Sequence, residues 1–290
     1  MAEARTYGTP GDFRRALVDR LSELSGRQEA VLLRLRRAVA FERLLARLFA
    51  DPQAPWVLKG GYSLEIRMRT EARGTRDLDL SMPAEGPFDA MGLLAKLRAV
   101  AASVPDPYFS FRIEEPSQML TGNPDGGARY PVTCVLDGRP FSSFHIDVGI
   151  GSSGAGTHEQ VTGHDFLGFA GIAPARMILI TLEQQFAEKI HAYTQKRPGV
   201  ENSRVRDLVD LVLLIRHGLQ PEPAVDALRA TFGARASQPL PTTLPKPPEA
   251  WREPYREMAA GMAAVPGESE AAFEIVNAFW NTLEFHPRRP

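Results

Sequence analysis

Two short motifs in this 290-residue chain carry residues that could bind a nucleotide and a metal ion. Gly60 and Gly61 follow a short apolar run, and small residues at a turn let backbone N–H groups approach a phosphate closely. Asp77 and Asp79 lie in an alternating apolar segment, so both carboxylates project to the same side of a predicted strand. Carboxylate oxygens are the ligands that Mg²⁺ prefers. Together the motifs predict phosphoryl or nucleotidyl transfer.

Residues around the two motifs extend the predicted site. Lys59 could pair with phosphate electrostatically, and the Ser63 hydroxyl could donate to the same phosphate. Asp147 lies mid-strand on the polar face of another alternating segment, so it is the predicted third carboxylate of a two-metal site. Such a site aligns an attacking hydroxyl with the α-phosphate and stabilises charge on both sides of the displacement. Taken singly, each motif also fits a plain tight turn or solvent-facing strand residues.

A lysine and two aspartates on consecutive predicted helices form a second group. Lys189 lies mid-helix, while Asp207 and Asp210 are spaced i and i+3 on one face of the following helix. A salt bridge between packed helices would explain this pattern. In the functional alternative, Lys189 contacts the triphosphate and Asp210 positions the lysine or acts as a base.

The elements that must position these residues follow from hydrophobic periodicity and turn signals. Asp137-Gly138 predicts a hairpin, and Thr181 with Gln184 three residues later predicts a helix N-terminus. Strands are expected at 55–58, 77–82, 108–114, 130–136 and 140–150. Helices are expected at 11–50 (broken at Ser25-Gly26), 63–69, 88–102, 182–195, 206–217, 251–263 and 268–283.

Composition limits the class of protein. With 43% hydrophobic residues, 24% charged residues and a net charge of −1, the chain can bury a core and is not disordered. The neutral balance argues against general electrostatic coating of nucleic acid. The single cysteine, Cys134, excludes an intramolecular disulfide and a Cys-based zinc site. No secretory signal is apparent, and no apolar run approaches the ~20 residues of a membrane helix, so a cytoplasmic protein without a membrane partner is expected.

The order of the motifs resembles the AbiEii/AbiGii (MenT-like) toxin family of nucleotidyltransferases. The resemblance covers roughly residues 15 to 218 and is carried by Lys-Gly-Gly-x-Ser-Leu from Lys59, Arg-Asp-Leu-Asp from Arg76, Glu-Lys-Ile-His-Ala from Glu188 and Arg-Asp-Leu-Val-Asp-Leu from Arg206. It implies an α+β protein with a polymerase-β-like nucleotidyltransferase core, N-terminal helices and a mostly helical C-terminal lobe. The expected division is a core over residues 1–165 and a lobe over residues 166–290 that completes the active-site cleft.

The resemblance also implies an activity and partners. Members of the family are toxins of type IV or related toxin–antitoxin systems and of phage defence, and the better-understood relatives add nucleotides, notably pyrimidines, to the 3′ end of tRNA. A Mg²⁺ (or Mn²⁺) ion, an NTP substrate, a tRNA acceptor and a cognate antitoxin are therefore expected, with translation blocked as the result.

Individual residues match the family's active-site motifs. Asp147 matches the third-acid position, and Thr75 falls where some relatives carry a serine that the antitoxin phosphorylates. Tyr62 departs from the small residue that relatives carry there, which predicts an altered nucleotide pocket. The other matching residues are Lys59, Gly60, Gly61, Ser63, Asp77, Asp79, Lys189 and Asp210.

Other functions remain open at this point. Nucleotidyl transfer to a protein is a variant of the same chemistry. A D-x-D glycosyltransferase that uses a nucleotide sugar would need Asp77 and Asp79 but not Lys189 or Asp210. A degenerate core that only binds a partner protein would not need the intact carboxylates.

Overall fold

The computed structural model describes residues 7–103, 108–120, 125–151, 158–195 and 204–285. The chain forms two units. The first consists of Met1–Tyr62, Gly74–Gly154 and His158–Leu179, and the second mainly of Ser63–Arg73 and Ile180–Pro290. The chain passes from the first unit to the second between Leu179 and Ile180, whereas the sequence suggests a boundary after residue 165. The short segment Ser63–Arg73 also belongs to the second unit.

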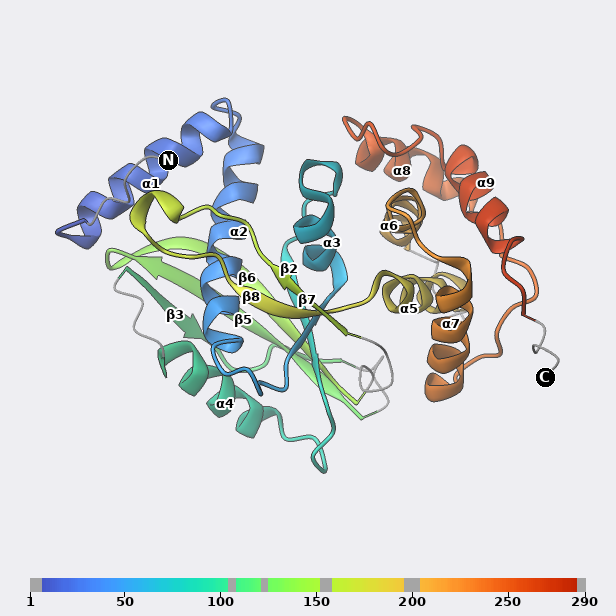
Figure 1. Ribbon diagram of the computed structural model, residues 1–290, viewed down its shortest axis with the longest axis horizontal. Coiled ribbons are helices and arrows are strands. Elements are labelled where there is room, and N and C mark those ends of the chain that lie inside the picture. Colours follow the sequence, from blue (N-terminus) through green and yellow to red (C-terminus); the bar gives the residue numbers. More distant parts are fainter. Residues whose placement is uncertain (1–6, 104–107, 121–124, 152–157, 196–203, 286–290) are drawn as a thin grey trace. The chain divides into compact units, whose positions relative to one another are not determined.

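The first unit is built on a mixed β-sheet (Figure 1). The strand order is β3-β5-β6-β2-β1-β8-β7, with β4 on β5. Strand β2 runs parallel to β6 and antiparallel to β1, while β5 is antiparallel to both β6 and β3. The strands are β1 (Val57–Lys59), β2 (Asp77–Met82), β3 (Phe109–Ile113), β4 (Gln118–Met119), β5 (Gly127–Leu136), β6 (Arg139–Ile150), β7 (His158–Thr162) and β8 (Arg176–Ile180).

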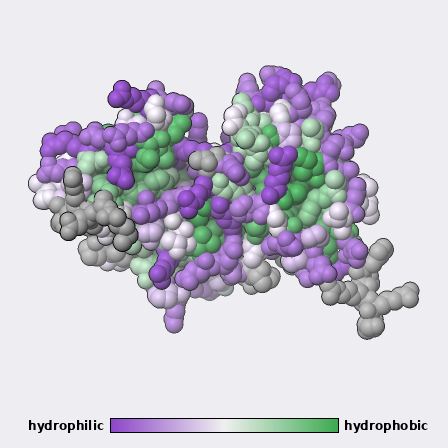
Figure 2. Space-filling model, turned by 45° about the horizontal axis from the view of Figure 1, so that its top comes forward, coloured by the Kyte–Doolittle hydropathy of each residue, from purple (hydrophilic) through white to green (hydrophobic). Residues whose placement is uncertain are grey.

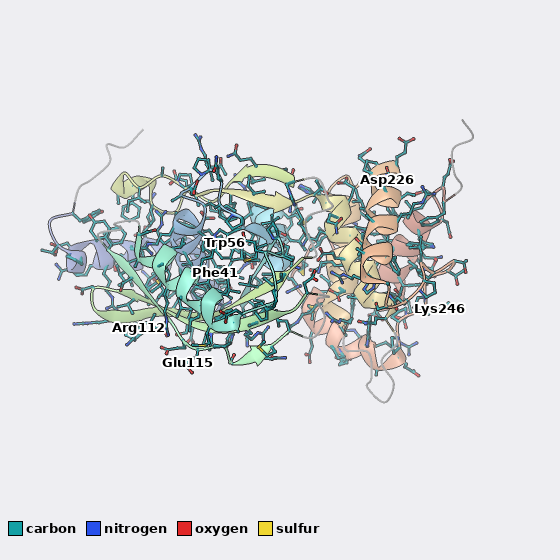
Figure 3. The ribbon with its side chains drawn as sticks, turned by 90° about the horizontal axis from the view of Figure 1, so that it is seen from below. Phe41, Trp56, Arg112, Glu115, Asp226 and Lys246 are labelled. Atoms are coloured by element: carbon teal, nitrogen blue, oxygen red, sulfur yellow. The ribbon has the colours of Figure 1, made fainter. Side chains whose placement is uncertain are left out.

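Helices cover this sheet because their apolar faces need a partner to bury them. Helix α2 (Glu29–Leu48) crosses the sheet at β6 and also contacts α1 (Pro10–Leu24) and α4 (Ala90–Ser103) (Figure 1). Phe41 of α2 and Trp56 lie inside the unit (Figure 3). The Phe41 ring packs edge-on against Tyr62 and Phe144, with 4.8 Å between ring centroids in each pair.

Helix α3 (Gly60–Met68) follows β1 directly, so the glycine pair forms the first turn of the helix. The sequence places this helix start at Ser63, three residues later than the structure does. The division between the two units falls within α3, after Tyr62.

The second unit is a helical assembly with its own apolar core. Leu64 and Met68 of α3 belong to this core, together with Phe186 and Leu208. Thr181 caps α5 as predicted, because its hydroxyl accepts from the Gln184 backbone N–H at 3.2 Å. The helices are α5 (Leu182–Thr194), α6 (Val205–Arg216), α7 (Pro221–Arg235), α8 (Arg252–Ala259) and α9 (Ser269–Trp280).

The structure confirms the predicted α+β class and most of the predicted elements. Asp137 and Gly138 form the expected hairpin, with φ angles of 54° and 68°. Strands β7 and β8 and helix α7 are absent from the sequence-based assignment. Strand β7 (His-Glu-Gln-Val-Thr) lies at the end of the strand order and carries little apolar signal, and α7 begins with two prolines that read as a turn.

Hydrophilic residues cover much of the face in Figure 2. None of the helices in the described part of the chain combines the length and the apolar character that crossing a bilayer requires. The large apolar side chains that remain exposed include Leu24, Val31, Leu33, Met91 and Met119.

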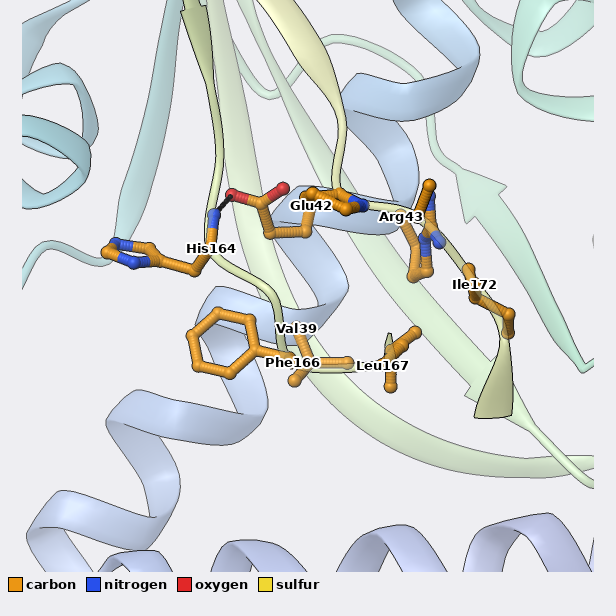
Figure 4. Close-up of a pocket in the computed structure, with 9 residues that line it drawn as sticks. Val39, Glu42, Arg43, His164, Phe166, Leu167 and Ile172 are labelled. Atoms are coloured by element: carbon orange, nitrogen blue, oxygen red, sulfur yellow. Dashed lines mark hydrogen bonds between the residues drawn. The ribbon is translucent and has the colours of Figure 1, made fainter. Parts of the chain in front are cut away.

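Tyr62 points into the interior of the first unit, and the altered nucleotide pocket stays a prediction. Its side chain is fully buried, and its hydroxyl donates to Glu42 at 3.0 Å and lies 3.3 Å from the Ala38 carbonyl oxygen. The Glu42 carboxylate also accepts from the backbone N–H of His164 at 3.1 Å, beside a pocket lined by Val39, Arg43 and other residues (Figure 4). Burial raises the pKa of Glu42, although these hydrogen bonds oppose the shift.

We expect Tyr62→Phe to lower the free energy of unfolding by about 2 kcal/mol, because a buried carboxylate loses a donor. Tyr130→Phe is the matched control, since the Tyr130 hydroxyl donates to a neutral acceptor, the Ala90 carbonyl, at 2.9 Å. Its expected cost is about 1 kcal/mol. Urea unfolding followed by circular dichroism measures both values, and an equal or smaller cost for Tyr62→Phe would contradict the assigned role of Glu42.

Candidate nucleotidyltransferase site

Strand register brings the predicted carboxylates of the first unit together. Asp79 on β2 lies directly opposite Asp147 on the parallel strand β6. The row continues outward to Lys59 on β1, which pairs with Asp79, and to Arg129 on β5, which pairs with Asp147. Residues paired in register point to the same face of a sheet. Two central negative charges are therefore flanked by two positive charges.

Asp77 belongs to the same face, two residues before Asp79. Its register partner on β6 is His145, whose Nδ1 lies 3.3 Å from the Asp77 carboxylate. Asp77 and His145 keep 28% and 44% of their side chains exposed, so this part of the face is open to solvent. The three predicted metal ligands thus share one accessible face of the sheet.

Gly60 allows Asp79 to lie against the start of α3. Its φ is +70°, a conformation that L-residues rarely adopt, and a Cβ at this position would overlap the Asp79 carboxylate and lie 2.7 Å from Asp79 Cβ. The N-terminal turn of a helix carries partial positive charge and unpaired N–H groups. The same turn that accommodates Asp79 therefore has the character that anion binding requires.

The other predicted nucleotide-binding residues, Lys59, Gly61 and Ser63, lie in different environments. Lys59 is half-buried at the end of β1, and Gly61 is buried in the first turn of α3. The Ser63 side chain is fully buried in the second unit, where its hydroxyl donates to Gln185 at 2.9 Å. In this arrangement the Ser63 hydroxyl joins α3 to α5, in contrast to the phosphate contact expected from the sequence.

Arg129 engages the carboxylates most strongly. Its Nε and one terminal nitrogen donate to the two oxygens of Asp147 at 2.7 and 2.6 Å, and the terminal nitrogen lies 3.7 Å from Asp77. The hydrogen bonds to Asp147, followed by its charge and those of Asp77 and Asp79, raise the pKa of Arg129 against the effect of burial. Among the residues that the structure describes, no three His, Cys, Asp or Glu side chains converge closely enough to hold a metal ion. The donor types and the shared face suit Mg²⁺, but the carboxylate oxygens must rearrange to share one.

Lys189 and Asp210 meet in the second unit. Lys189 Nζ lies 2.6 Å from Asp210 and 3.1 Å from Asp207, and Arg73 donates to both oxygens of Asp210 at 2.8 and 2.7 Å. Asp210 is fully buried and only 11% of the Lys189 side chain is exposed. The salt bridge between packed helices is therefore present, with Arg73 as an additional member.

Lys189 and Asp210 stabilise each other's ionised forms. Burial on its own would lower the pKa of Lys189, but the carboxylates of Asp210 and Asp207 outweigh it and raise the pKa. Burial would likewise raise the pKa of Asp210, but Lys189 and Arg73 lower it. Both groups therefore stay charged at neutral pH.

Thr75 is buried two residues before β2. Its hydroxyl lies 3.4 Å from the Asp77 carbonyl oxygen, and its own carbonyl accepts from Arg37 at 2.8 Å. Phosphorylation of this hydroxyl would require the segment to move.

Arg129 and Arg73 are the two site residues that the sequence-based interpretation misses. The sequence predicts this strand over residues 130–136, so Arg129 falls just outside it, and its pairing with Asp147 depends on register. Arg73 lies only four residues before Asp77, and its partner Asp210 is 137 positions away in the sequence. A composition in which most basic residues are arginine offers no signal that separates these two from the rest.

We expect Gly60→Ala to lower the free energy of unfolding by about 3 kcal/mol, because it combines an unfavourable φ with a clash against Asp79. Gly138→Ala isolates the backbone effect, since Gly138 has a φ of +68° and open space around its Cβ position. Its expected cost is about 1 kcal/mol. Equal costs in urea unfolding would show that Asp79 does not press against Gly60.

We expect Asp210→Asn to lower the free energy of unfolding at pH 7 by about 3–5 kcal/mol, because it leaves two buried cations undercompensated. The lowered pKa of Asp210 means that its stabilisation is present above the ordinary value of 3.8 and is lost as the pH falls below it. The difference from wild type should therefore shrink in acid. Asp226→Asn, at an exposed position of α7 (Figure 3), should change stability by less than about 0.5 kcal/mol. Similar losses of unfolding free energy in Asp210→Asn and Asp226→Asn would contradict the stabilising role of the buried cluster of Lys189, Asp210 and Arg73.

Comparisons with known proteins indicate the family of this chain. The family model described as nucleotidyl transferase AbiEii toxin, type IV TA system, matches residues 43–283. A comparison with curated proteins finds no match. Among solved structures, an antigenic nucleotidyltransferase-like protein from Paracoccidioides brasiliensis is 14% identical, with 69% of this chain and 89% of that chain covered and a TM-score of 0.39. The antibiotic-resistance factor ANT(2'')-Ia is 16% identical, with 69% and 92% covered and a TM-score of 0.38.

The family match includes the strands that carry Asp77, Asp79 and Asp147 and the helices that carry Lys189 and Asp210. It extends over most of the chain. The chain therefore belongs to the AbiEii family of nucleotidyltransferase toxins of type IV toxin–antitoxin systems.

Proposed function

We propose that this toxin transfers a nucleotidyl group from an NTP to the 3′ end of tRNA in a Mg²⁺-dependent reaction, and that the modified tRNA no longer supports translation. The observation that carries the proposal is the register of β2 on β6, which sets Asp79 opposite Asp147 and Asp77 on the same face. A nucleotidyltransferase of this family uses an NTP, and the carboxylate face provides the donor types for its divalent ion.

The reaction is an in-line displacement at the α-phosphorus. The oxygen of the acceptor hydroxyl forms a bond to phosphorus, the bond to the bridging oxygen of the β-phosphate breaks, and pyrophosphate leaves. The proton of the hydroxyl passes to a base. A bound Mg²⁺ would supply electrostatic stabilisation of the charge that develops on the phosphate oxygens.

The predicted site residues of the first unit described below each have a role in this proposal. Asp77, Asp79 and Asp147 would hold the metal ion. The backbone at Gly60 and Gly61 would donate to phosphate at the start of α3, where the helix terminus favours negative charge. Lys59, at the end of β1 and paired with Asp79, would add a positive charge next to this turn.

Lys189 retains its proposed role of neutralising the triphosphate. The raised pKa keeps its ammonium charged, and Asp207 and Asp210 fix its position. Asp210 acts on Lys189 in this proposal, since its carboxylate is fully buried and bound by both Lys189 and Arg73.

A type IV toxin has an antitoxin as its counterpart. We propose a cytoplasmic setting, where tRNA and NTPs are available, and a part in phage defence. Thr75 is the proposed position of modification by the antitoxin, because it matches the position of a serine that the antitoxin phosphorylates in some relatives. Thr75 is buried, so its segment would have to move for this modification.

The test is labelling of total tRNA with each α-³²P-labelled NTP in turn. Wild-type protein should label tRNA in the presence of Mg²⁺ and not in excess chelator. Asp77→Asn and Asp79→Asn should each lower the rate by about a hundredfold or more, because each removes a charged metal ligand. Asp19→Asn, at an exposed position of α1, should leave the rate unchanged.

Oxidation of the tRNA 3′ diol with periodate separates the possible acceptors. Loss of labelling after oxidation supports transfer to the 3′ end. Labelling of a protein, with tRNA unlabelled, would replace the proposed acceptor with a protein. Equal labelling by wild type and both aspartate variants would refute the catalytic assignment.

A further inference from the structure

Arg129 binds the carboxylate that the proposed metal ion would need. Its fork donates to both oxygens of Asp147 at 2.6 and 2.7 Å, so each oxygen already has one strong partner. The same guanidinium lies 3.7 Å from Asp77. One side chain thus contacts two of the three proposed metal ligands.

The ion pair is not needed to hold strands β5 and β6 together. Their antiparallel pairing runs from Gly127 opposite Gly149 to Leu136 opposite Arg139, with alternate β5 residues buried along its length. The pairing is therefore stabilised by a long hydrogen-bonded ladder and by apolar burial. A partly exposed ion pair adds little to such a ladder.

Electrostatics explains why a cation belongs at this position. Asp79 and Asp147 lie directly opposite each other, and like charges in register repel. Arg129 compensates Asp147 and, more weakly, Asp77. Within the described residues, the three carboxylates do not converge closely enough to hold a metal ion.

The guanidinium has room to leave. Arg129 keeps 31% of its side chain exposed, whereas Asp147 keeps 13%. Its stem is anchored on strand β5. A change of side-chain rotamer, without a change in the sheet, would free Asp147.

We propose that Arg129 is a positioning residue that holds Asp147 and competes with the divalent ion for this carboxylate. This inference rests on the proposed function, because it assumes that Asp77, Asp79 and Asp147 hold the ion. The ion and the guanidinium then compete for the Asp147 oxygens, so the pair lowers the affinity for metal. Arg129 thereby keeps the carboxylate face neutralised until a divalent ion replaces it.

The test measures Mn²⁺ binding to the full chain without nucleotide, from the electron paramagnetic resonance signal of free Mn²⁺. Arg129→Gln should bind Mn²⁺ about tenfold more tightly than wild type, because a competing positive charge is removed. Arg129→Lys should lie between the two, since a lysine cannot make the forked contact. Arg112→Gln, which removes the same charge from β3 of the same sheet (Figure 3), should match wild type.

Unchanged or weaker Mn²⁺ binding by Arg129→Gln overturns the inference, as does the absence of Mn²⁺ binding by both wild type and variant. Circular dichroism checks folding, and Arg129→Lys decides the result if Arg129→Gln does not fold. The tRNA-labelling assay on wild type is read separately. Labelling with unchanged Mn²⁺ affinity in the variant defeats only this inference, whereas tighter Mn²⁺ binding without labelling defeats only the proposed reaction.

Discussion

The parallel register of β2 on β6 is the constraint on which the rest of the first unit depends. It sets Asp79 opposite Asp147, and repulsion between the two carboxylates must be compensated within the fold. Lys59 and Arg129 extend the same row on the two flanking strands, so four neighbouring strands contribute one charge each. A one-residue slip of any of them would turn its charged residue to the opposite face. The arrangement therefore needs a well-specified sheet beneath it.

The buried side of the unit provides this specification. Tyr62, next to the glycine pair, donates to Glu42 of α2 and packs edge-on against Phe41. Glu42 in turn accepts from the backbone of the segment that leads to β8. A buried carboxylate with several donors is costly to displace. It therefore ties the first turn of α3, where Gly60 meets Asp79, to the helix that covers the sheet.

The second unit uses ionic contacts differently. Asp210 has no exposed surface and is compensated by Lys189 and Arg73, whereas the carboxylates on the sheet remain partly open to solvent. A fully buried ion pair holds its side chains in fixed positions. A partly exposed ion pair leaves its carboxylate accessible to another cation. The two groups of charges therefore differ in solvent access: one holds Lys189 in a closed cluster, and the other is the face on which the proposed metal site lies.

The sequence by itself determined most of the elements and the residue types of the site, but it missed β4, β7, β8 and α7. Periodicity located β2 and β6, turn chemistry located the Asp137-Gly138 hairpin, and the order of the motifs indicated the family. What it could not supply were the partners of those residues, because contacts between distant segments depend on strand register and helix packing. Only the tertiary structure set Arg129 on Asp147, Arg73 on Asp210 and Tyr62 on Glu42. In each case a local pattern defines which face a side chain takes, but the charge that it meets there comes from another part of the chain.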